Sequence, residues 1–167
     1  MESYLDYVVK LNLTPHPEGG YYKEVYRSNE NIDQNALPKR YAGDRNFGTS
    51  IYYLLPNGTF SSFHRLKSDE IWNFYLGSSL VIYLLTDEIT PSVITLGNNI
   101  ANGEQPQFTI PKNTWFAATP NGNLPFSLVG CTVCPGFDFN DFELGKKDEL
   151  IKMFPQHIKL IEDFTLQ

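Results

Sequence analysis

Short segments rich in aromatic and β-branched residues follow one another between residues 47 and 134, with turn residues between them. Pro56-Asn57-Gly58, Asn102-Gly103 and Pro120-Asn121-Gly122 are the clearest turn signals. Short strands at this spacing, divided by Gly, Asn and Pro turns, are typical of β-sandwiches and barrels. The pattern predicts strands at Gly48–Leu55, Phe60–Arg65, Ile71–Leu76, Leu80–Leu85, Ser92–Leu96, Gln107–Ile110, Thr114–Ala118 and Phe126–Cys134.

The two ends of the chain differ from this central part. Apolar residues at helical spacing predict a helix over Ser3–Leu13, which ends before the first proline. Tyr21–Arg27 alternates and carries aromatic residues, so it is predicted to be a strand. Lys146–Phe164 is mostly helical in pattern, with one interrupting proline. No repeat or linker divides residues 1–167, which are therefore predicted to form a single all-β domain with helices at its ends.

A polar stretch without periodicity, Ser28–Asn46, separates the first predicted strand from the central part. Connections of this length are uncommon in compact domains and are usually either disordered or functional. Two interpretations follow: a mobile surface loop, or a flap that closes over a pocket.

Composition limits the classes of partner. The formal net charge of −6 argues against a nucleic-acid surface and gives no support for docking on anionic membranes. No apolar run approaches the ~18 residues that a membrane span needs, and the first residues do not resemble a signal peptide. We therefore expect a cytoplasmic protein, whose two cysteines would remain thiols.

The stretch from Gly58 to Gly77 contains an imidazole and a carboxylate, His64 and Glu70, between two glycines that permit tight turns. Glu70 stands where its strand begins and could turn back towards His64. The two groups could ligate a metal together with others, form a hydrogen-bonded general acid–base pair, or simply satisfy each other as buried polar groups. The spacing alone leaves all three interpretations open.

Strand alternation predicts the neighbours of this pair. Ser62 shares the face of His64, while Trp72 and Phe74 share the face of Glu70. Aromatic residues make up 14% of the chain, and an aromatic interior with a few polar groups is the usual composition of a small-molecule pocket. Core packing is the alternative explanation for most of these aromatic residues.

The spacing of Gly58, His64, Glu70 and Gly77 resembles the first motif of the cupins, and further segments resemble one branch of them, the Cupin_5 (DUF985) family of RmlC-like cupins. The resemblance implies a double-stranded β-helix, or jelly roll, usually paired into a homodimer. It implies no assigned reaction; some members have been likened to seed-storage and auxin-binding cupins and others to sugar-nucleotide epimerases. The segments that carry the resemblance are His16–Tyr22, Glu24–Ser28, Thr49–Leu55, Phe63–Leu66, Ser68–Trp72, Pro111–Ala118, Val129–Val133 and Pro135–Phe139.

Two positions depart from the metal-binding pattern of that family. Leu66 stands where the first motif has a second histidine, and Phe116 stands where the second motif has its histidine. Tight binding of a transition metal typically needs about three protein ligands. We therefore expect no tightly held metal and no cofactor, with His64 and Glu70 as weak metal candidates only.

Cys131 and Cys134 have the CxxC spacing of redox and zinc sites. Their run is predicted to be a strand, in which residues three apart face opposite sides, and no second CxxC follows. The favoured interpretation is two ordinary strand thiols.

Five further polar residues are candidates for the pocket or for the surface. His16 could lie on the surface, while Glu18 is a pocket candidate because the family resemblance implies that its segment lies near the barrel mouth. His157 is predicted to be a solvated helix residue. Arg27 and Arg45 could reach an anion in a pocket, although surface charge is the favoured interpretation for each.

The sequence thus predicts a small-molecule-binding cupin with a His/Glu pair in an aromatic pocket. The alternative is a metal-independent isomerase or epimerase acting on a sugar or sugar-nucleotide-like metabolite, with His64 as base and Tyr52, Tyr53 or Tyr75 as acid. A metal-dependent dioxygenase is disfavoured. The candidate pocket residues are His64, Glu70, Ser62, Trp72, Phe74, Phe116 and Glu18.

Overall fold

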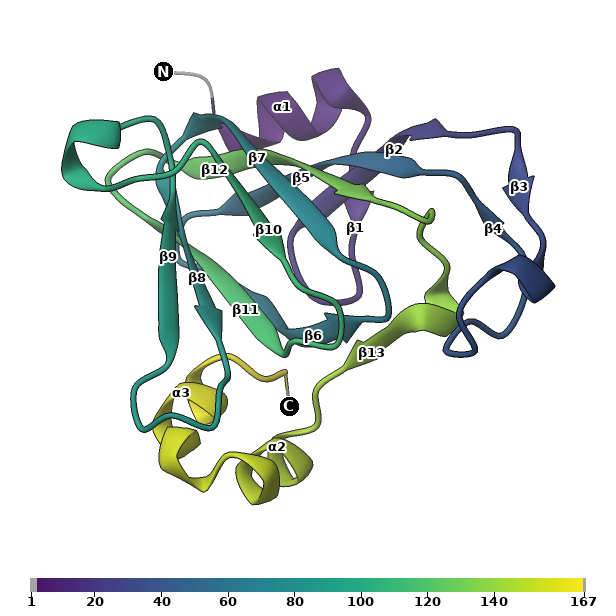
Figure 1. Ribbon diagram of the computed structural model, residues 1–167. Helices are drawn as coiled ribbons and strands as arrows, with labels where there is room; N and C mark the ends of the chain where they lie inside the picture. The colour runs from purple at the N-terminus through teal and green to yellow at the C-terminus, as the bar shows by residue number, and fades with distance from the viewer. Residues whose placement is uncertain (1–2, 167) are drawn as a thin grey trace.

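The computed structural model describes residues 3–166, which form two curved antiparallel sheets that face each other (Figure 1). One sheet has the strand order β1-β2-β5-β12-β7-β10, the other has the order β13-β6-β11-β8-β9, and β3 pairs with β4. The strands are β1 (Thr14–Pro15), β2 (Tyr21–Arg27), β3 (Asn31–Ile32), β4 (Arg45–Asn46), β5 (Thr49–Pro56), β6 (Ser61–Leu66), β7 (Glu70–Gly77), β8 (Ser79–Leu84), β9 (Ser92–Leu96), β10 (Gln107–Ile110), β11 (Phe116–Asn121), β12 (Phe126–Val133) and β13 (Phe142–Leu144).

The predicted all-β character and most predicted strands are confirmed. Tyr21–Arg27, Ser92–Leu96 and Gln107–Ile110 have the predicted bounds, and the others differ by one residue at one or both ends, except β11. That strand begins two residues later than predicted, at Phe116, and continues to Asn121 because it pairs with β8 along its whole length. Tertiary pairing, rather than local propensity, sets these bounds.

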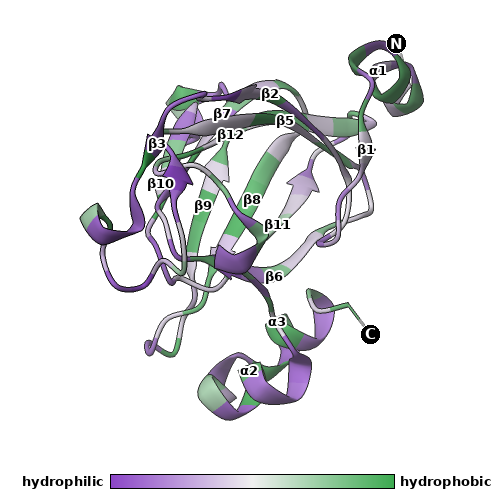
Figure 2. Cartoon of the chain, turned by 90° about the vertical axis from the view of Figure 1, so that its right-hand side faces the viewer, coloured by the Kyte–Doolittle hydropathy of each residue, from purple (hydrophilic) through white to green (hydrophobic). Residues whose placement is uncertain are grey.

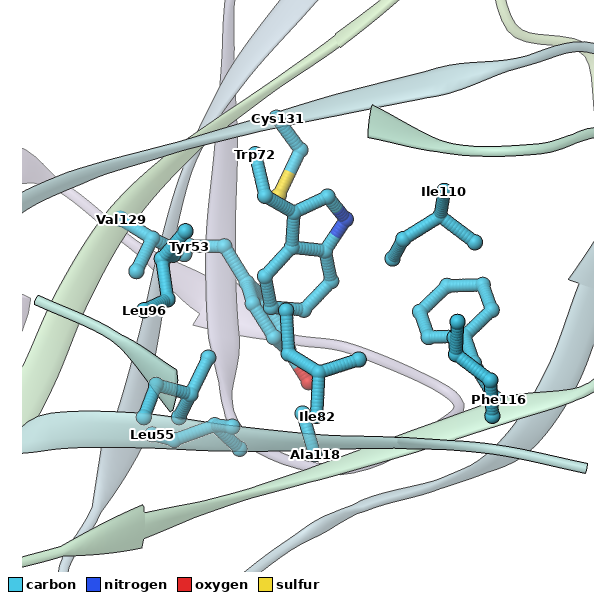
Figure 3. Close-up of a cluster of buried hydrophobic side chains, with 12 residues drawn as sticks. Tyr53, Leu55, Trp72, Ile82, Leu96, Ile110, Phe116, Ala118, Val129 and Cys131 are labelled. Atoms are coloured by element: carbon cyan, nitrogen blue, oxygen red, sulfur yellow. The ribbon is translucent and has the colours of Figure 1, made fainter. Parts of the chain in front are cut away.

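The interior between the sheets holds the main apolar cluster (Figure 3). Trp72 lies at its centre, with its ring 5.7 Å from that of Tyr53 and 5.8 Å from that of Phe116. Alternating residues of β5, β7 and β12 supply one wall, because side chains of a strand point to opposite faces in turn. The buried members are Tyr53, Leu55, Trp72, Leu80, Ile82, Leu84, Leu96, Ile110, Phe116, Ala118, Val129 and Cys131.

Helices cover the outer faces of the barrel (Figure 2). Helix α1 (Tyr4–Leu11) begins at Ser3, whose side chain forms a capping box with Asp6. It packs over Leu54 and Leu128 on the outside of the larger sheet. Helices α2 (Lys147–Met153) and α3 (Ile158–Asp163) are joined by the 3₁₀ turn η4 (Pro155–His157) and cover the outside of the smaller sheet. The predicted terminal helices are thus confirmed.

The prediction for His157 is wrong. This residue is buried rather than solvated, and its Nε2 lies 3.2 Å from the carbonyl oxygen of Thr86. Sequence pattern suggested a helix residue facing solvent, but η4 turns the chain so that the ring lies against the loop after β8.

The polar stretch Ser28–Asn46 has definite structure and is not a flap. It contains β3, β4 and the 3₁₀ turn η1 (Gln34–Ala36), and none of its residues lines the cavity described below. Arg45 at its end is buried and donates two hydrogen bonds to Asp141, at 2.6 and 2.8 Å. Surface charge is therefore the wrong interpretation of Arg45, which fastens this stretch to η3 (Phe139–Asp141), the turn before β13.

No helix among residues 3–166 is long and apolar enough to cross a membrane.

Candidate ligand-binding cavity

One side of the barrel interior contains a cavity of about 540 Å³. Its deep wall comes from β5, β6, β7 and β12, and its outer part comes from the segment that precedes β13. The lining residues are His16, Glu18, Tyr22, Glu24, Arg27, Ile51, Tyr53, His64, Leu66, Glu70, Trp72, Cys131, Phe137, Asp138, Phe139 and Phe142.

A β-bulge in β6 decides which side chains of that strand reach the cavity. Phe116 of β11 lies opposite His64, whereas Ala118 lies opposite Ser61, so β6 contains one extra residue between these two pairs. Ser61 and His64 consequently point the same way. Ser62, predicted to share the face of His64, instead bonds the backbone of Phe164.

His64 is held at both ring nitrogens. Its Nδ1 lies 2.7 Å from the carbonyl oxygen of Ser62, an acceptor, so Nδ1 carries a proton and donates it. Its Nε2 lies 3.1 Å from Oε2 of Glu18. Glu18, rather than Glu70, is therefore the carboxyl partner of His64, which corrects the predicted pairing. The reason is tertiary: the turn between β1 and β2 inserts Glu18 beside β6.

The turn that carries Glu18 requires glycine. Gly19 has φ of +117°, and a Cβ there would lie 2.3 Å from the carbonyl oxygen of Phe60. This close approach lets the carbonyl of Glu18 accept a hydrogen bond from the Ser62 amide at 2.8 Å. The Ser61 hydroxyl donates to Oε1 of Glu18 at 2.8 Å. Backbone and side chain together hold the carboxyl group in place.

Burial sets the protonation of this pair. It lowers the pKa of His64 to about 4, although the bond to the Ser62 carbonyl favours the protonated ring. Burial also raises the pKa of Glu18, with smaller opposing effects from His16 and Ser61. Both shifts disfavour the charged forms, and the 3.1 Å contact between Oε2 of Glu18 and the unprotonated Nε2 of His64 needs one proton, which we assign to Glu18 as the donor.

Glu70 is a second buried carboxyl group in the cavity wall. Burial raises its pKa to about 8. Its Oε2 has no hydrogen-bond partner among the described residues, and neither has the indole nitrogen of Trp72. Burial likewise raises the pKa of the Cys131 thiol well above its usual value. The floor of the cavity thus holds polar atoms whose bonding capacity is unused.

The cavity contains some of the predicted pocket residues and not others. Glu18, His64, Glu70 and Trp72 line it. Phe116 and Phe74 belong instead to the apolar cluster, Phe116 with its ring 4.0 Å from that of His64. Phe116 therefore packs against the imidazole ring of His64 without lining the cavity.

The donor atoms do not fit the metal site that the fold family implies. Leu66 lines the cavity with an apolar side chain, and Phe116 packs against His64 where another ligand would be needed. Both nitrogens of His64 already have partners within the chain. Among residues 3–166, no three His, Cys, Asp or Glu side chains are arranged to hold a metal ion.

Several lining residues were not predicted. His16 reaches the cavity beside Glu18, at 3.4 Å from its Oε2, and its ring meets Tyr22 at 4.6 Å. Phe139 and Phe142 come from a segment whose short strand β13 pairs with β6. Their dense aromatic composition was visible in the sequence, but only this pairing brings them to the opening.

Of the remaining candidates, Tyr53 and Cys131 line the cavity, whereas Tyr52, Tyr75 and Cys134 do not. Tyr53 lines the cavity but donates its hydroxyl proton to the carbonyl of Gly19, at 2.8 Å. Tyr52 and Tyr75 contact each other, ring to ring, at 6.1 Å. Both cysteines are free thiols: Cys131 is buried within β12, and Cys134, just beyond the end of β12, is exposed.

Known proteins share this architecture. A crystal structure of a protein from Shewanella oneidensis is 40% identical, with a TM-score of 0.88 over 99% of both chains. An uncharacterized protein of Saccharomyces cerevisiae is 30% identical over 149 residues, which are 84% of this chain and 74% of that one. A cupin 2 domain-containing protein from Halorhodospira halophila, 12% identical, has a TM-score of 0.54 over 92% of this chain and 88% of that one, and this likeness shows the fold alone.

The family comparison agrees with the fold. The model of Cupin_5, described as Cupin superfamily (DUF985), matches residues 6–145. The jelly-roll barrel predicted from the sequence is thereby confirmed. The chain belongs to the DUF985 family of the cupin superfamily.

Proposed function

We propose that this chain binds a small organic molecule in the barrel cavity. The volume of about 540 Å³ lies within the range of roughly 300–1000 Å³ that is usual for ligand pockets. Trp72, Tyr22 and Phe142 provide aromatic surface, while the Glu18–His64 pair and Glu70 provide a few polar groups. Such a combination suits a ligand with an apolar body and a small number of polar atoms.

The observation that carries the proposal is the unused bonding capacity of Glu70. Buried polar atoms are nearly always hydrogen-bonded, and leaving one unpaired costs about 1–3 kcal/mol. Oε2 of Glu70 and the indole nitrogen of Trp72 are both buried and form no hydrogen bond of good geometry among residues 3–166, although the indole and the Cys131 thiol lie close enough to the carboxyl group to lower its pKa against the larger effect of burial. A ligand that supplies a hydrogen-bond partner to Oε2 of Glu70 would remove that cost. A purely structural role for Glu70 leaves the unpaired oxygen unexplained.

A thermal-shift screen of small metabolites tests the proposal. Wild type is compared with His64→Ala and Glu70→Gln, and with Glu149→Gln as a control, because Glu149 is exposed on α2 away from the cavity. At least one compound should raise the Tm of wild type and of Glu149→Gln, and raise it less in the two cavity variants. Equal shifts in all four proteins, or no shift from any compound, would contradict binding in this cavity.

A metal-independent proton transfer, as in an isomerase or epimerase, is a second candidate. It is favoured by a neutral imidazole and a neutral carboxyl group in one cavity, because the pKa of His64 is lowered to about 4 and that of Glu70 is raised to about 8; His64 acts as base once its Nε2 exchanges the Glu18 hydrogen bond for the substrate. Since Tyr53 donates to a backbone carbonyl, Glu70 suits the role of acid better. Solvent deuterium entering a bound substrate at one carbon, and lost in His64→Ala, is the expected result; its absence across a panel of sugars and hydroxy acids would count against catalysis.

A further inference from the structure

Carboxyl groups outnumber basic side chains among the described residues that line the cavity. Four carboxyl groups line it, from Glu18, Glu24, Glu70 and Asp138. Among the described lining residues, Arg27 is the one Lys or Arg. Burial lowers the pKa of His16 and of His64, so neither imidazole adds positive charge at neutral pH.

Arg27 is not available as a free anion receptor. Its Nε and one terminal nitrogen donate to the two carboxylate oxygens of Glu24, at 2.9 and 2.7 Å. Its other terminal nitrogen donates to Oδ1 of Asn46 at 2.6 Å, and the terminal nitrogen that meets Glu24 also donates to the carbonyl oxygen of Phe137 at 3.2 Å. A bidentate pair of this kind leaves little of the guanidinium charge for a ligand. A carboxylate or phosphate entering the cavity would therefore find no unpaired Arg or Lys among the described lining residues, whereas an ammonium group would find the unpartnered Oε2 of Glu70.

Aromatic rings line the route to the deep carboxyl groups. The ring centres of Phe137 and Phe139 are 5.0 Å apart, and that of Phe142 lies 6.1 Å from Phe139 and 5.5 Å from His64. The faces of aromatic rings attract cations, particularly where water is excluded. The same surface also accommodates the apolar body of an organic ligand.

We propose that the cavity selects an organic amine, whose ammonium group pairs with the carboxyl group of Glu70 while its apolar part packs on the aromatic walls. This inference rests on the proposed binding function and specifies its ligand class. Glu70 is the better partner because Glu18 already uses Oε1 with Ser61 and Oε2 with His64. Glu70 has an unpartnered Oε2, and an ammonium donor brought to it would favour its ionised form.

Matched ligand pairs test this proposal by calorimetry at low salt. The probes are tryptamine and indole-3-propionate, and phenethylamine and 3-phenylpropionate, in which amine and acid share one skeleton. Wild type should bind at least one amine about tenfold or more tightly than its matched acid, the effect of one hydrogen bond between charged groups. Glu70→Gln should lose that preference, whereas Glu149→Gln should keep it.

The outcomes separate this inference from the binding function on which it rests. If the acids bind as tightly as the amines or more tightly, the amine inference is overturned while small-molecule binding stands. If none of the four probes binds at millimolar concentration, the amine inference is also overturned, and the metabolite screen alone decides the binding function. If Glu70→Gln does not fold, the preference of wild type between the members of each pair still decides.

Discussion

The protonation of the Glu18–His64 pair controls how stability depends on pH. The pKa of His64 is lowered from 6.5 to about 4 by burial. A lowered pKa means that His64 stabilises the native state above pH 6.5 and that this contribution is lost as the pH falls through the folded value. The shift of roughly 2.5 units corresponds to about 3 kcal/mol, at about 1.4 kcal/mol per unit.

The perturbation is His64→Gln, which removes the titrating group and keeps a polar side chain of similar length. Between pH 6.5 and pH 4, wild type should lose about 3 kcal/mol of unfolding free energy relative to the variant. Urea unfolding followed by tryptophan fluorescence, repeated across this pH range, measures the difference. Because Glu18 titrates in both proteins, the variants Glu18→Gln and Glu18→Gln/His64→Gln complete a cycle that isolates the imidazole.

A charged pair of His64 and Glu18 would give the opposite dependence of stability on pH. An imidazolium–carboxylate ion pair would raise the pKa of His64 above 6.5, and its stabilisation would be lost as the pH rises through that value. If wild type gains stability over His64→Gln as the pH falls, the assignment of a neutral pair is refuted. An NMR titration of the ring protons of His64 that gives a pKa above 6.5 would refute it independently.

Three further predictions concern the scaffold. Arg45→Met should cost about 3–5 kcal/mol in urea unfolding because it leaves the buried Asp141 with only the longer contact to Lys67, at 3.6 Å, while Arg65→Met at an exposed pair should cost about 1 kcal/mol or less; equal costs would contradict the importance of burial. Gly19→Ala should destabilise the protein by more than about 2 kcal/mol, since the new Cβ meets a backbone carbonyl at positive φ, and unchanged unfolding would show that the turn can relax. The homodimer implied by the family resemblance stays a prediction, and light scattering coupled to size-exclusion chromatography should give twice the mass of 19.1 kDa, whereas a monomer mass would contradict it.

Strand alternation predicted only part of the cavity wall. Alternation correctly indicated that His64, Glu70 and Trp72 belong to the barrel interior. Alternation wrongly placed Ser62 on the same face as His64, because a bulge adds one residue to β6. No sequence pattern indicates that bulge. Alternation also paired His64 with Glu70, which is nearer in the sequence, whereas the carboxyl group that contacts the ring is Glu18.

Contacts between distant residues explain why the stretch over residues 28–46 was harder to predict than the strands. The stretch over residues 28–46 is polar and lacks periodicity, so it resembles a mobile loop, yet Arg45 fixes its end through a buried pair with Asp141. The two partners are 96 residues apart in the sequence. Long-range ion pairs of this kind leave no local pattern, because each partner alone is indistinguishable from an exposed charged residue.

The sequence by itself determined the strand succession, the terminal helices, the cupin family and the replacement of two metal-ligand positions by Leu66 and Phe116. These features depend on local periodicity, turn residues and residue identity, all of which can be read from the sequence. Tertiary structure alone decided that Glu18 partners His64, that Glu70 keeps an unpaired oxygen, and that carboxyl groups outnumber cations around the cavity. These features arise from the meeting of distant segments, and burial then changes the protonation of the groups that meet.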